Sequence, residues 1–552
     1  MAARLWNSQF VAYAPEQDDP VQPIGFGTTT AAGSSTTIVD VGGIADSSGA
    51  DYYNGQYWVT ILSGTYKGQS KRVVDDDGDG TLTLESAFAG APGSGIEYQL
   101  WKSSEPMILV DSSADATTVV DALRDEADDY WIGCSIEPIT GNRSGEVELV
   151  TDFVSATGTF TTGSFSGALA AGDVCYLRRA IEAVNLSAAP AQPYVPSESP
   201  RLDLSRGKGR PGARSGTVSF DLPVRGSGSL AGADVVATAA EMHGLMQACG
   251  YVEVTGKTMT IDDAAASTTV IDVAAGDGAN VEIGQAIQYN GNVSYVTDQT
   301  VADTLTVSPP FPVAPADTDL LHASRTYRKY RPSDDTQPKG VTIYTERDGV
   351  RTTYFGCMGN VEFLAGGAGE LVGRFSFTAT HWVLEDDENL AGEALYEAYA
   401  STQKILGSEL TAYLDTTQVD VHGVAINGGH AYSPKTVAGK YGLNGVATIE
   451  TQDVRPMIRL GKLIAESDDA MAAEAIYQVG TSKAVSLVYG SHGNCIAFRA
   501  PAARLIEAPV PGDYESRIST PYVLECQNAG TGVDANESPT QVKIPDFSIH
   551  IF

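Results

Sequence analysis

Three aspartates at alternate positions are the residues of this chain that come closest to a set of metal ligands. Asp75, Asp77 and Asp79 match positions one, three and five of a calcium-binding EF-hand loop. Position 12 of such a loop requires a bidentate glutamate, but here it is Ser86, and Glu85 comes one residue early. The aspartates are therefore a candidate cation site, and the favoured alternative is a solvated turn between two strands.

Other patterns that carry chemistry are missing from the sequence. The histidines have no zinc-ligand spacing, and no nucleophile elbow, P-loop or dinucleotide fingerprint is present. The six cysteines include no C-x-x-C pair, which favours buried reduced thiols over a zinc site or a disulfide framework. We predict that the protein is not an enzyme and requires no metal or cofactor.

One cationic cluster stands out in an acidic chain. It consists of Arg201, Arg206, Lys208, Arg210 and Arg214, whereas the formal net charge of the whole chain is −34. No aromatic residue lies between these positions to stack on bases, so the cluster does not indicate nucleic-acid binding. We predict a contact loop that binds an acidic surface on another copy of the chain, with a merely solvated loop as the alternative.

Composition limits the classes of protein to which the chain can belong. Its 552 residues are 42% hydrophobic and 19% charged, a globular balance with enough length for several domains. The 58 glycines, 26 prolines and frequent Thr, Val and Tyr residues favour strands and tight turns. The acidity argues against nonspecific binding of nucleic acid or anionic membrane. Without an apolar leader or a run of 18 apolar residues, we expect a soluble protein assembled in the host cytoplasm.

A threefold repeat defines three small β-modules. The motif at residues 36–40 recurs at 117–121 and 268–272, and the motif at 80–84 recurs at 158–162 and 303–307. Each copy spans about 70–80 residues of short strands separated by turn signals, which predicts antiparallel β-modules. We place them at 24–101, 102–180 and 257–324, and most of the negative charge of the chain lies within them.

A second, twofold repeat organises the remainder of the chain. Residues 216–221 match 445–450, and both alternate as half-buried strands. A segment with helical spacing follows each of them and ends at Gly250 or Gly480, as expected after a helix C-terminus. Further strand residues then match at one offset, Val341 with Val485 for example. The chain therefore contains one domain twice.

These repeats predict a mainly β protein with a few helices, of the α+β class. Its core is two tandem β-sandwich or barrel domains, each with one packed helix, to which the three antiparallel β-modules are added. The predicted boundaries, in chain order, are an N-terminal arm at 1–23, modules at 24–101 and 102–180, domain A at 186–256 and 325–385 interrupted by the module at 257–324, a bridge at 386–407, and domain B at 408–552.

The duplicated domain resembles a viral protein family. The stretch 212–225, the helix that ends at 245–250, the strand 341–344 with its turn at 348–349, and Gly369 before 375–377 are similar to the major tail tube protein of long-tailed (siphovirus-type) bacteriophages. The tandem copy resembles the members of that family with two tube domains per chain. The three β-modules depart from its simplest members.

The resemblance implies a structural virion protein of the viral tail. Its rings would stack into a hollow conduit for genome delivery, with a wall that is a continuous β-barrel, a helix outside it and a long loop that reaches the next ring. Double-stranded DNA would pass through without specific binding. The implied partners are further copies of the chain, the tape measure, the tail terminator and the distal tail or baseplate proteins, with no membrane.

Two further expectations follow from the duplication and the modules. Because single-domain members close as sixfold rings, two fused domains predict trimeric rings of this chain, with hexameric rings as the alternative. We expect the acidic modules to project from the outer surface. A different class of function also remains open, namely a surface-adhesion or decoration protein whose repeated modules bind host polysaccharide.

Overall fold

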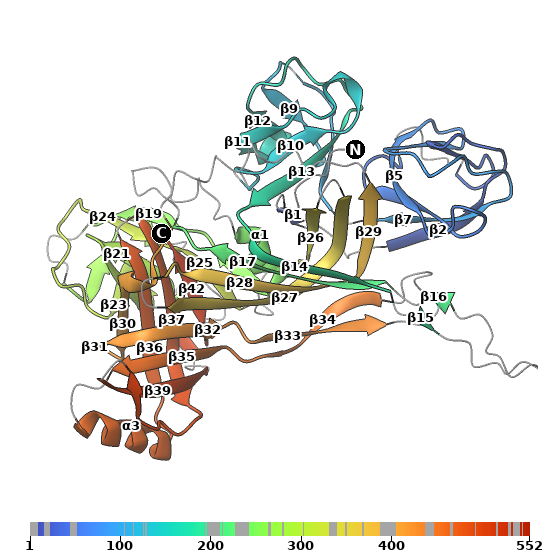
Figure 1. Cartoon of the computed structure of the whole chain (residues 1–552). Coiled ribbons are helices and arrows are strands. Elements are labelled where there is room, and N and C mark those ends of the chain that lie inside the picture. The colour runs from blue at the N-terminus through green and yellow to red at the C-terminus, as the bar shows by residue number, and fades with distance from the viewer. Residues whose placement is uncertain are drawn as a thin grey trace, which may run out of the picture.

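The computed structural model shows a protein built mainly of antiparallel strands, which confirms the expected β-rich α+β class. The described part of the chain contains two α-helices, α1 (His243–Ala248) and α3 (Ser467–Val479). Figure 1 shows two lobes above an elongated body of strands and α3 at the opposite side. The structure describes residues 9–15, 22–44, 52–103, 105–113, 115–124, 126, 130–192, 194–195, 210–211, 214–226, 242–262, 267–278, 281–301, 303–329, 339–347, 350–366, 369–386, 404–436, 446–463, 467–491, 493–514, 517–527, 531–533, 541–543 and 545–552.

The three β-modules share one strand topology. Module 1 has the strand order β2-β7-β4-β5-β6-β3, and module 3 has the equivalent order β19-β24-β21-β22-β23-β20. In module 2, the pairings give the same order, β8-β13-β10-β11-β12-β9. The strands of module 1 are β2 (Gln22–Thr28), β3 (Thr37–Val39), β4 (Tyr57–Ile61), β5 (Ser70–Asp76), β6 (Thr81–Leu84) and β7 (Glu97–Lys102). Those of module 2 are β8 (Met107–Leu109), β9 (Thr118–Val120), β10 (Ser135–Pro138), β11 (Glu148–Val154), β12 (Thr159–Thr162) and β13 (Val174–Ile181). Those of module 3 are β19 (Lys257–Thr260), β20 (Val270–Asp272), β21 (Ala286–Tyr289), β22 (Asn292–Val301), β23 (Thr304–Ser308) and β24 (Leu320–Ala323).

The repeated sequence motifs pair with each other in every module, in one register in modules 1 and 2 and with the motif at 268–272 shifted by one residue in module 3. The apolar residues that lie opposite each other are fully buried, because alternate residues of a strand face the module's own core. In module 3 the buried residue is Ile271, whereas Val270 at the centre of the motif is 42% exposed. A phenylalanine that follows the second motif donates its backbone N–H to Ser35, Ala116 or Thr268 in the three copies. The three cross-strand pairs are Ile38 with Leu82, Val119 with Phe160, and Ile271 with Leu305.

The duplicated core consists of two units, called unit A and unit B, that repeat one pattern of strand pairs. In unit A, β14 pairs with β17, β17 with β28, β28 with β27, and β27 with β26. In unit B, β32 pairs with β35, β35 with β39, β39 with β37, and β37 with β36. Unit A contains β14 (Val184–Ala191), β17 (Ser215–Pro223), β26 (Val341–Arg347), β27 (Val350–Gly366), β28 (Val372–Ala379) and β29 (His381–Asp386). Unit B contains β32 (Val421–Asn427), β35 (Met457–Leu463), β36 (Lys483–Ser491), β37 (Asn494–Leu505), β38 (Gly512–Tyr514) and β39 (Arg517–Cys526).

The N-terminal segment belongs to unit A and is not a free arm over its described residues. β1 (Gln9–Pro15) pairs with β26 along its whole length and also with β13. In unit B, β30 (Leu410–Leu414) pairs with β36 in the equivalent place. Modules 1 and 2 are therefore inserted between β1 and β14 of unit A. Of the predicted bridge at 386–407, residues 387–403 lie outside the described residues.

Glycine ends both helices as the sequence predicts. Gly250 has φ +81° and Gly480 has φ +70°, conformations that other residues adopt at a cost. The strand correspondence requires one correction. The sequence match sets residues 445–450 against 216–221, but the pairing partner equivalent to β17 is β35, whereas β34 (Val446–Val454) pairs with β33 (His430–Thr436) in a separate hairpin. Alternating apolar residues occur in both β34 and β35, so alternation alone selected the wrong one.

The remaining strands extend these sheets. Two-stranded pairs form between β15 and β16 and between β40 and β41. No helix in the described residues is long and apolar enough to cross a membrane. The strands not yet given are β15 (Tyr194–Val195), β16 (Arg210–Pro211), β18 (Tyr251–Val254), β25 (Arg325–Lys329), β31 (Thr417–Val419), β40 (Thr531–Val533), β41 (Gln541–Lys543) and β42 (Ser548–Ile551).

Candidate functional site: strand edges and module junctions

The three candidate cation-site aspartates lie at the end of β5 and in the turn to β6, where all three are exposed. Asp77 accepts hydrogen bonds from the backbone N–H groups of Asp79 and Thr81, both at 3.0 Å. Desolvation opposes ionisation of Asp77, but these bonds outweigh it and lower the pKa of Asp77. Among the described residues, no group of three or more His, Cys, Asp or Glu is placed to hold a metal ion. The carboxylate of Asp77 stabilises a hairpin turn.

Replacing Asp77 with alanine is expected to lower the free energy of unfolding by less than about 1 kcal/mol, because its bonds are made at an exposed turn. Melting temperatures of the natural protein should be equal in millimolar calcium and in EDTA. Differential scanning calorimetry of both proteins in both buffers measures this. A calcium-dependent rise in melting temperature that the substitution abolishes would instead establish a cation site.

The predicted contact loop is described only at its end. Arg201, Arg206 and Lys208 lie outside the described residues, and Arg210 is described as part of β16. Arg214 donates to the backbone oxygen of Gly68 at 2.8 Å and to that of Trp382 at 3.3 Å.

The guanidinium of Arg214 also lies 4.8 Å from the centre of the Trp382 ring. Burial lowers the pKa of Arg214. Arg214 therefore fastens module 1 to unit A within the chain, and the contact between copies stays a prediction for the cluster. The sequence identified Arg214 as a cation but gave no sign that it would bind the backbone oxygens of Gly68 and Trp382.

Units A and B are joined by strand pairing. Residues 362–366 at the end of β27 pair with residues 423–427 of β32. The two units therefore form one run of eight paired strands, β14-β17-β28-β27-β32-β35-β39-β37, to which each unit contributes four in the same order. In Figure 1, β27, β28 and β32 run side by side through the middle of the body.

A single hydrophobic core spans the joint between the units. Phe363 of β27 and Phe498 of β37 are buried, with ring centroids 4.9 Å apart. Val424 and Ile426 of β32 point into the same core and are 6% and 1% exposed. The side chains at the joint are therefore buried as in a domain interior, and the two units share one core.

The opposite face of the run of strands is polar and more open. In β28, Phe375 and Phe377 are buried, whereas Arg374 and Ser376, which alternate with them, are exposed. The same alternation places Thr217 of β17 on this polar face. Arg374 forms an ion pair with Asp221 at 2.9 Å. In unit A this face carries small polar residues and the Arg374–Asp221 pair, and in unit B it also carries the exposed Arg459 of β35.

A buried ionic cluster holds modules 1 and 2 on unit A. Arg72 of module 1 forms ion pairs with Glu85 and Glu105, and the side chains of Arg72 and Glu105 are fully buried. Glu105, in the segment that leads to module 2, also accepts a hydrogen bond from the Tyr344 hydroxyl of β26 at 3.1 Å. Arg72 and Glu85 pair within module 1, whereas the charge of Glu105 is compensated only while module 1 and this segment are in contact.

Tyr176 and Arg351 complete this ionic cluster. The Tyr176 hydroxyl of module 2 donates to Glu85 at 2.6 Å, and Arg351 of β27 donates to Tyr176 at 2.8 Å. Desolvation would raise the pKa of Glu85, but Arg351 and Arg72 outweigh it and lower that pKa. Four of the six residues that form the cluster are charged, yet no side chain of the four is more than 5% exposed.

An aromatic cluster lies beside the ionic cluster. Trp58 and Trp101 of module 1 stack at 5.3 Å, and Phe355 of β27 meets both of them edge to face at 5.6 and 5.5 Å. The His381 ring contacts Trp101 at 5.1 Å, and burial lowers the pKa of His381 so that the ring is neutral. Module 1 therefore docks on the outer side of the β26–β27 hairpin.

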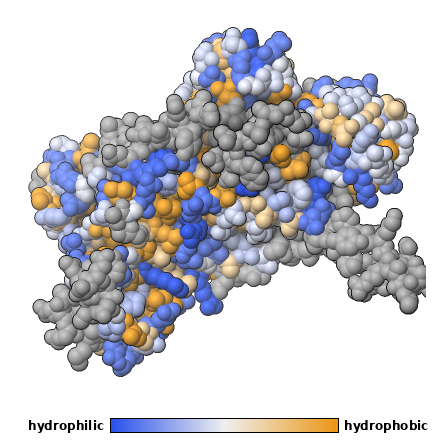
Figure 2. All heavy atoms as spheres, in the orientation of Figure 1, coloured by the Kyte–Doolittle hydropathy of each residue, from blue (hydrophilic) through white to orange (hydrophobic). Residues whose placement is uncertain are grey.

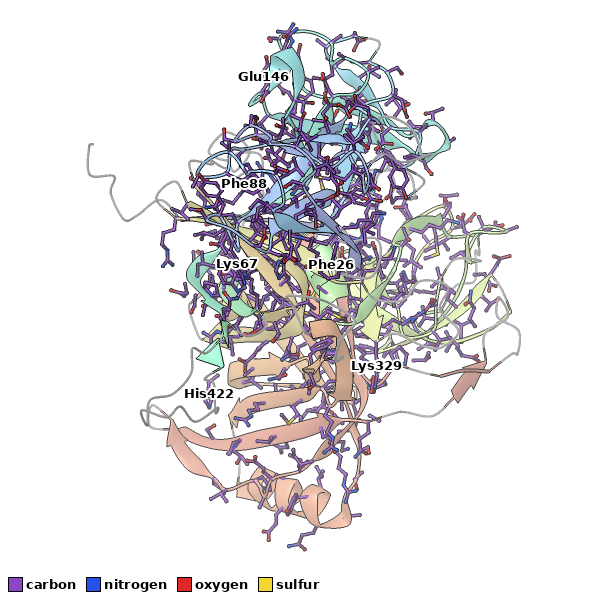
Figure 3. The ribbon with its side chains drawn as sticks, turned by 90° about the vertical axis from the view of Figure 1, so that its right-hand side faces the viewer. Phe26, Lys67, Phe88, Glu146, Lys329 and His422 are labelled. Atoms are coloured by element: carbon purple, nitrogen blue, oxygen red, sulfur yellow. The ribbon has the colours of Figure 1, made fainter. Side chains whose placement is uncertain are left out.

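Module 3 docks on the equivalent hairpin of unit B, although it is inserted in unit A. The Tyr295 hydroxyl lies 2.6 Å from Ser486 Oγ of β36, and Arg499 of β37 lies 4.6 Å from the Tyr295 ring. Cys495 and Phe552 pack against the same ring in a small buried cluster. The outer sides of β26–β27 and of β36–β37 are thus both covered by modules. In Figure 3, Phe88 of module 1 and Glu146 of module 2 lie above Lys329 and His422 of the units.

The buried histidines and cysteines have structural surroundings. The His550 ring lies 2.8 Å from Thr326 Oγ1 and 2.9 Å from Ser548 Oγ, and burial lowers its pKa to about 3. It is fully enclosed between module 3 and unit B. All six cysteines are reduced and buried, which agrees with the interpretation drawn from their spacing.

No protein-family model matches the chain, and a search of curated proteins also finds no match. The fold and its edges by themselves define the class: a β-rich protein of two repeated units, joined edge to edge and carrying three repeated modules on one side. No catalytic arrangement of side chains emerges from the groups described above. The features that bear on function are the strand edges, the polar face of the run of strands, and the hairpin faces that the modules cover.

Proposed function

We propose that this protein is a major tail tube subunit of a bacteriophage, whose copies form stacked rings around a conduit for genome delivery. The observation that carries the proposal is the run of eight strands, in which unit B continues the sheet of unit A with the same strand order. A contact between two unlike edges can be repeated by further copies, and it closes into a ring when the rotation per unit allows.

Three chains per ring follow from the duplication. Each chain supplies two equivalent units, and the resemblance to single-domain tube proteins implies six units per ring. A barrel of given diameter fixes the number of strands and not the number of chains. Six chains would need a much wider barrel or would leave one unit of each chain outside the wall.

The polar face of the run of strands suits a channel wall for DNA. Thr217 and Ser376 are uncharged, and the charge of Arg374 is paired with that of Asp221. Unpaired cations on this face would bind phosphates through release of counterions and retard the passage of DNA. The wall is neutral to acidic in this proposal, and double-stranded DNA passes without specific binding.

The modules occupy the other side, which becomes the tube exterior. They cover the outer hairpins of both units, so a tube with the polar face inside carries all three modules outside. The visible surface of module 2 is mostly hydrophilic in Figure 2, as an outer surface should be, whereas hydrophobic residues gather on the body of the units. The tape measure, the tail terminator and the distal tail or baseplate proteins are the partners in the virion tail.

Electron microscopy of the purified full chain tests this function. We expect hollow rings or filaments of uniform diameter, with threefold symmetry in rotational averages of single rings. Native mass spectrometry of rings should give three chains. Particles that remain single chains at high concentration, combined with binding to a polysaccharide array, would instead support the adhesion or decoration protein considered from the sequence.

A further inference from the structure

We propose that two chains join by adding β14 of one copy to residues 506–514 of another, in the way that β32 adds to β27 within one chain. This inference rests on the proposed function and deepens it by naming the two edges that meet.

The joint between β32 and β27 within one chain indicates which strands meet between two chains. On one side of that joint, β14 is the counterpart of β32. β14 pairs with β17, which pairs with β28, and β32 pairs with β35, which pairs with β39. Both pairs also contain a register shift at their start, between Val184 and Ser187 and between Val421 and Val424.

On the other side of the joint within the chain is the end of β27. Its counterpart in unit B is the segment 506–514, which follows β37. Like residues 358–364 of β27, which run along β28, this segment runs along the equivalent strand, β39. The backbone N–H of Ile506 donates to Val523 at 3.0 Å, and residues 512–514 of β38 pair with β39.

Both proposed edges are open in the single chain. β14 pairs with β17, and no second strand pairs with it among the described residues. Val184, Ile506 and Val510 are 42%, 40% and 67% exposed. Exposed apolar residues on strand edges mark surfaces that another strand covers.

A second copy is the occupant, because β14 and residues 506–514 lie at opposite ends of the same strand order. The edge at one end of a chain therefore matches the edge at the other end of the next. Pro190, Pro509 and Pro511 have no N–H to donate, so this joint contains fewer backbone hydrogen bonds than β27 with β32. Side-chain contacts of the exposed valines and Ile506 consequently contribute more to it.

A pair of cysteines tests the joint directly. The joint within the chain sets Glu362 opposite Asn427, and their counterparts on the two proposed edges are Ile506 and Ser187. Both are exposed and the six natural cysteines are buried, so a Ser187→Cys/Ile506→Cys protein places its only exposed thiols opposite each other across the joint. After assembly and oxidation, denaturing electrophoresis should show a ladder of linked chains. Ser187→Cys combined with Ala91→Cys, an exposed position in module 1, is the matched control and should give no ladder.

A charge on the edge gives a second measurement. Val510→Asp should raise the concentration at which half of the protein is assembled by about tenfold or more, because burying an unpaired carboxylate costs over about 1.4 kcal/mol. Val479→Asp, on α3 at 79% exposure, is the control and should leave that concentration unchanged.

The outcomes separate the joint from the function. Hollow rings without a ladder, and with normal assembly of Val510→Asp, would overturn the joint and leave the tube function standing. A ladder from assemblies that are not hollow would support the joint and overturn the tube function. Protein that neither assembles nor forms a ladder would overturn both.

Discussion

Replacing Glu105 with alanine is expected to lower the free energy of unfolding by about 3–5 kcal/mol, because it leaves the charge of buried Arg72 without its fully buried partner. The Tyr344 hydroxyl also loses its acceptor. Modules 1 and 2 and unit A share this cluster, so the loss should also weaken their contact. Denaturant unfolding followed by tryptophan fluorescence measures it, since Trp58 lies beside Arg72, 4.4 Å from its guanidinium.

A surface ion pair in module 2 provides the matched control. Glu146 lies 3.9 Å from Arg143, and both side chains are about one-third exposed. Glu146→Ala should therefore change stability far less than Glu105→Ala, because the ion pair is exposed to solvent. Equal effects of Glu105→Ala and Glu146→Ala would show that the cluster is not buried in solution.

The same cluster makes stability depend on pH in a defined direction. The pKa of Glu85 is below its ordinary value of 4.5, since Arg351 and Arg72 outweigh the effect of desolvation. A carboxylate with a lowered pKa in the folded protein contributes stability that is present above its ordinary pKa and is lost as pH falls below it. The contribution of Glu85 is therefore expected to decline below about pH 4.5.

Local patterns predicted the local structure. The alternating motifs gave the paired strands of each module, and Ile38 with Leu82 is repeated as Ile271 with Leu305 because the same apolar residues face equivalent cores. Gly250 and Gly480 marked the ends of both helices, since they occupy a conformation with positive φ. These features depend on residues close together in the chain.

Contacts between distant segments had no such signal. Arg351 and Glu85 are 266 residues apart, and neither has neighbours that indicate burial or pairing. The interpretation of β1 as part of an arm failed for the same reason, because its partners in β26 are more than 300 residues further along the chain. The aspartates near β6 resembled metal ligands only because turns and EF-hand loops both use aspartate and glycine.

Replacing Phe498 with alanine is expected to destabilise both units together, although Phe498 belongs to unit B. Its ring is fully buried and contacts Phe363 of unit A at 4.9 Å and Tyr489 of unit B at 6.1 Å. Removing a buried phenylalanine costs about 3–5 kcal/mol through lost contacts and the cavity left behind. Since the core is continuous across the joint, the cost should appear on both sides of it.

Hydrogen exchange measured by mass spectrometry separates the units in this test. In Phe498→Ala, peptides from β27 and from β37 should lose protection together, while peptides from module 1 keep theirs. Phe88→Ala is the matched control, because Phe88 is 2% exposed in the separate core of module 1. It should affect module 1 peptides and spare β37. Loss of protection confined to β36 and β37 in Phe498→Ala would show that unit B unfolds alone, and that the two units are coupled only by the strand pairing of β27 with β32.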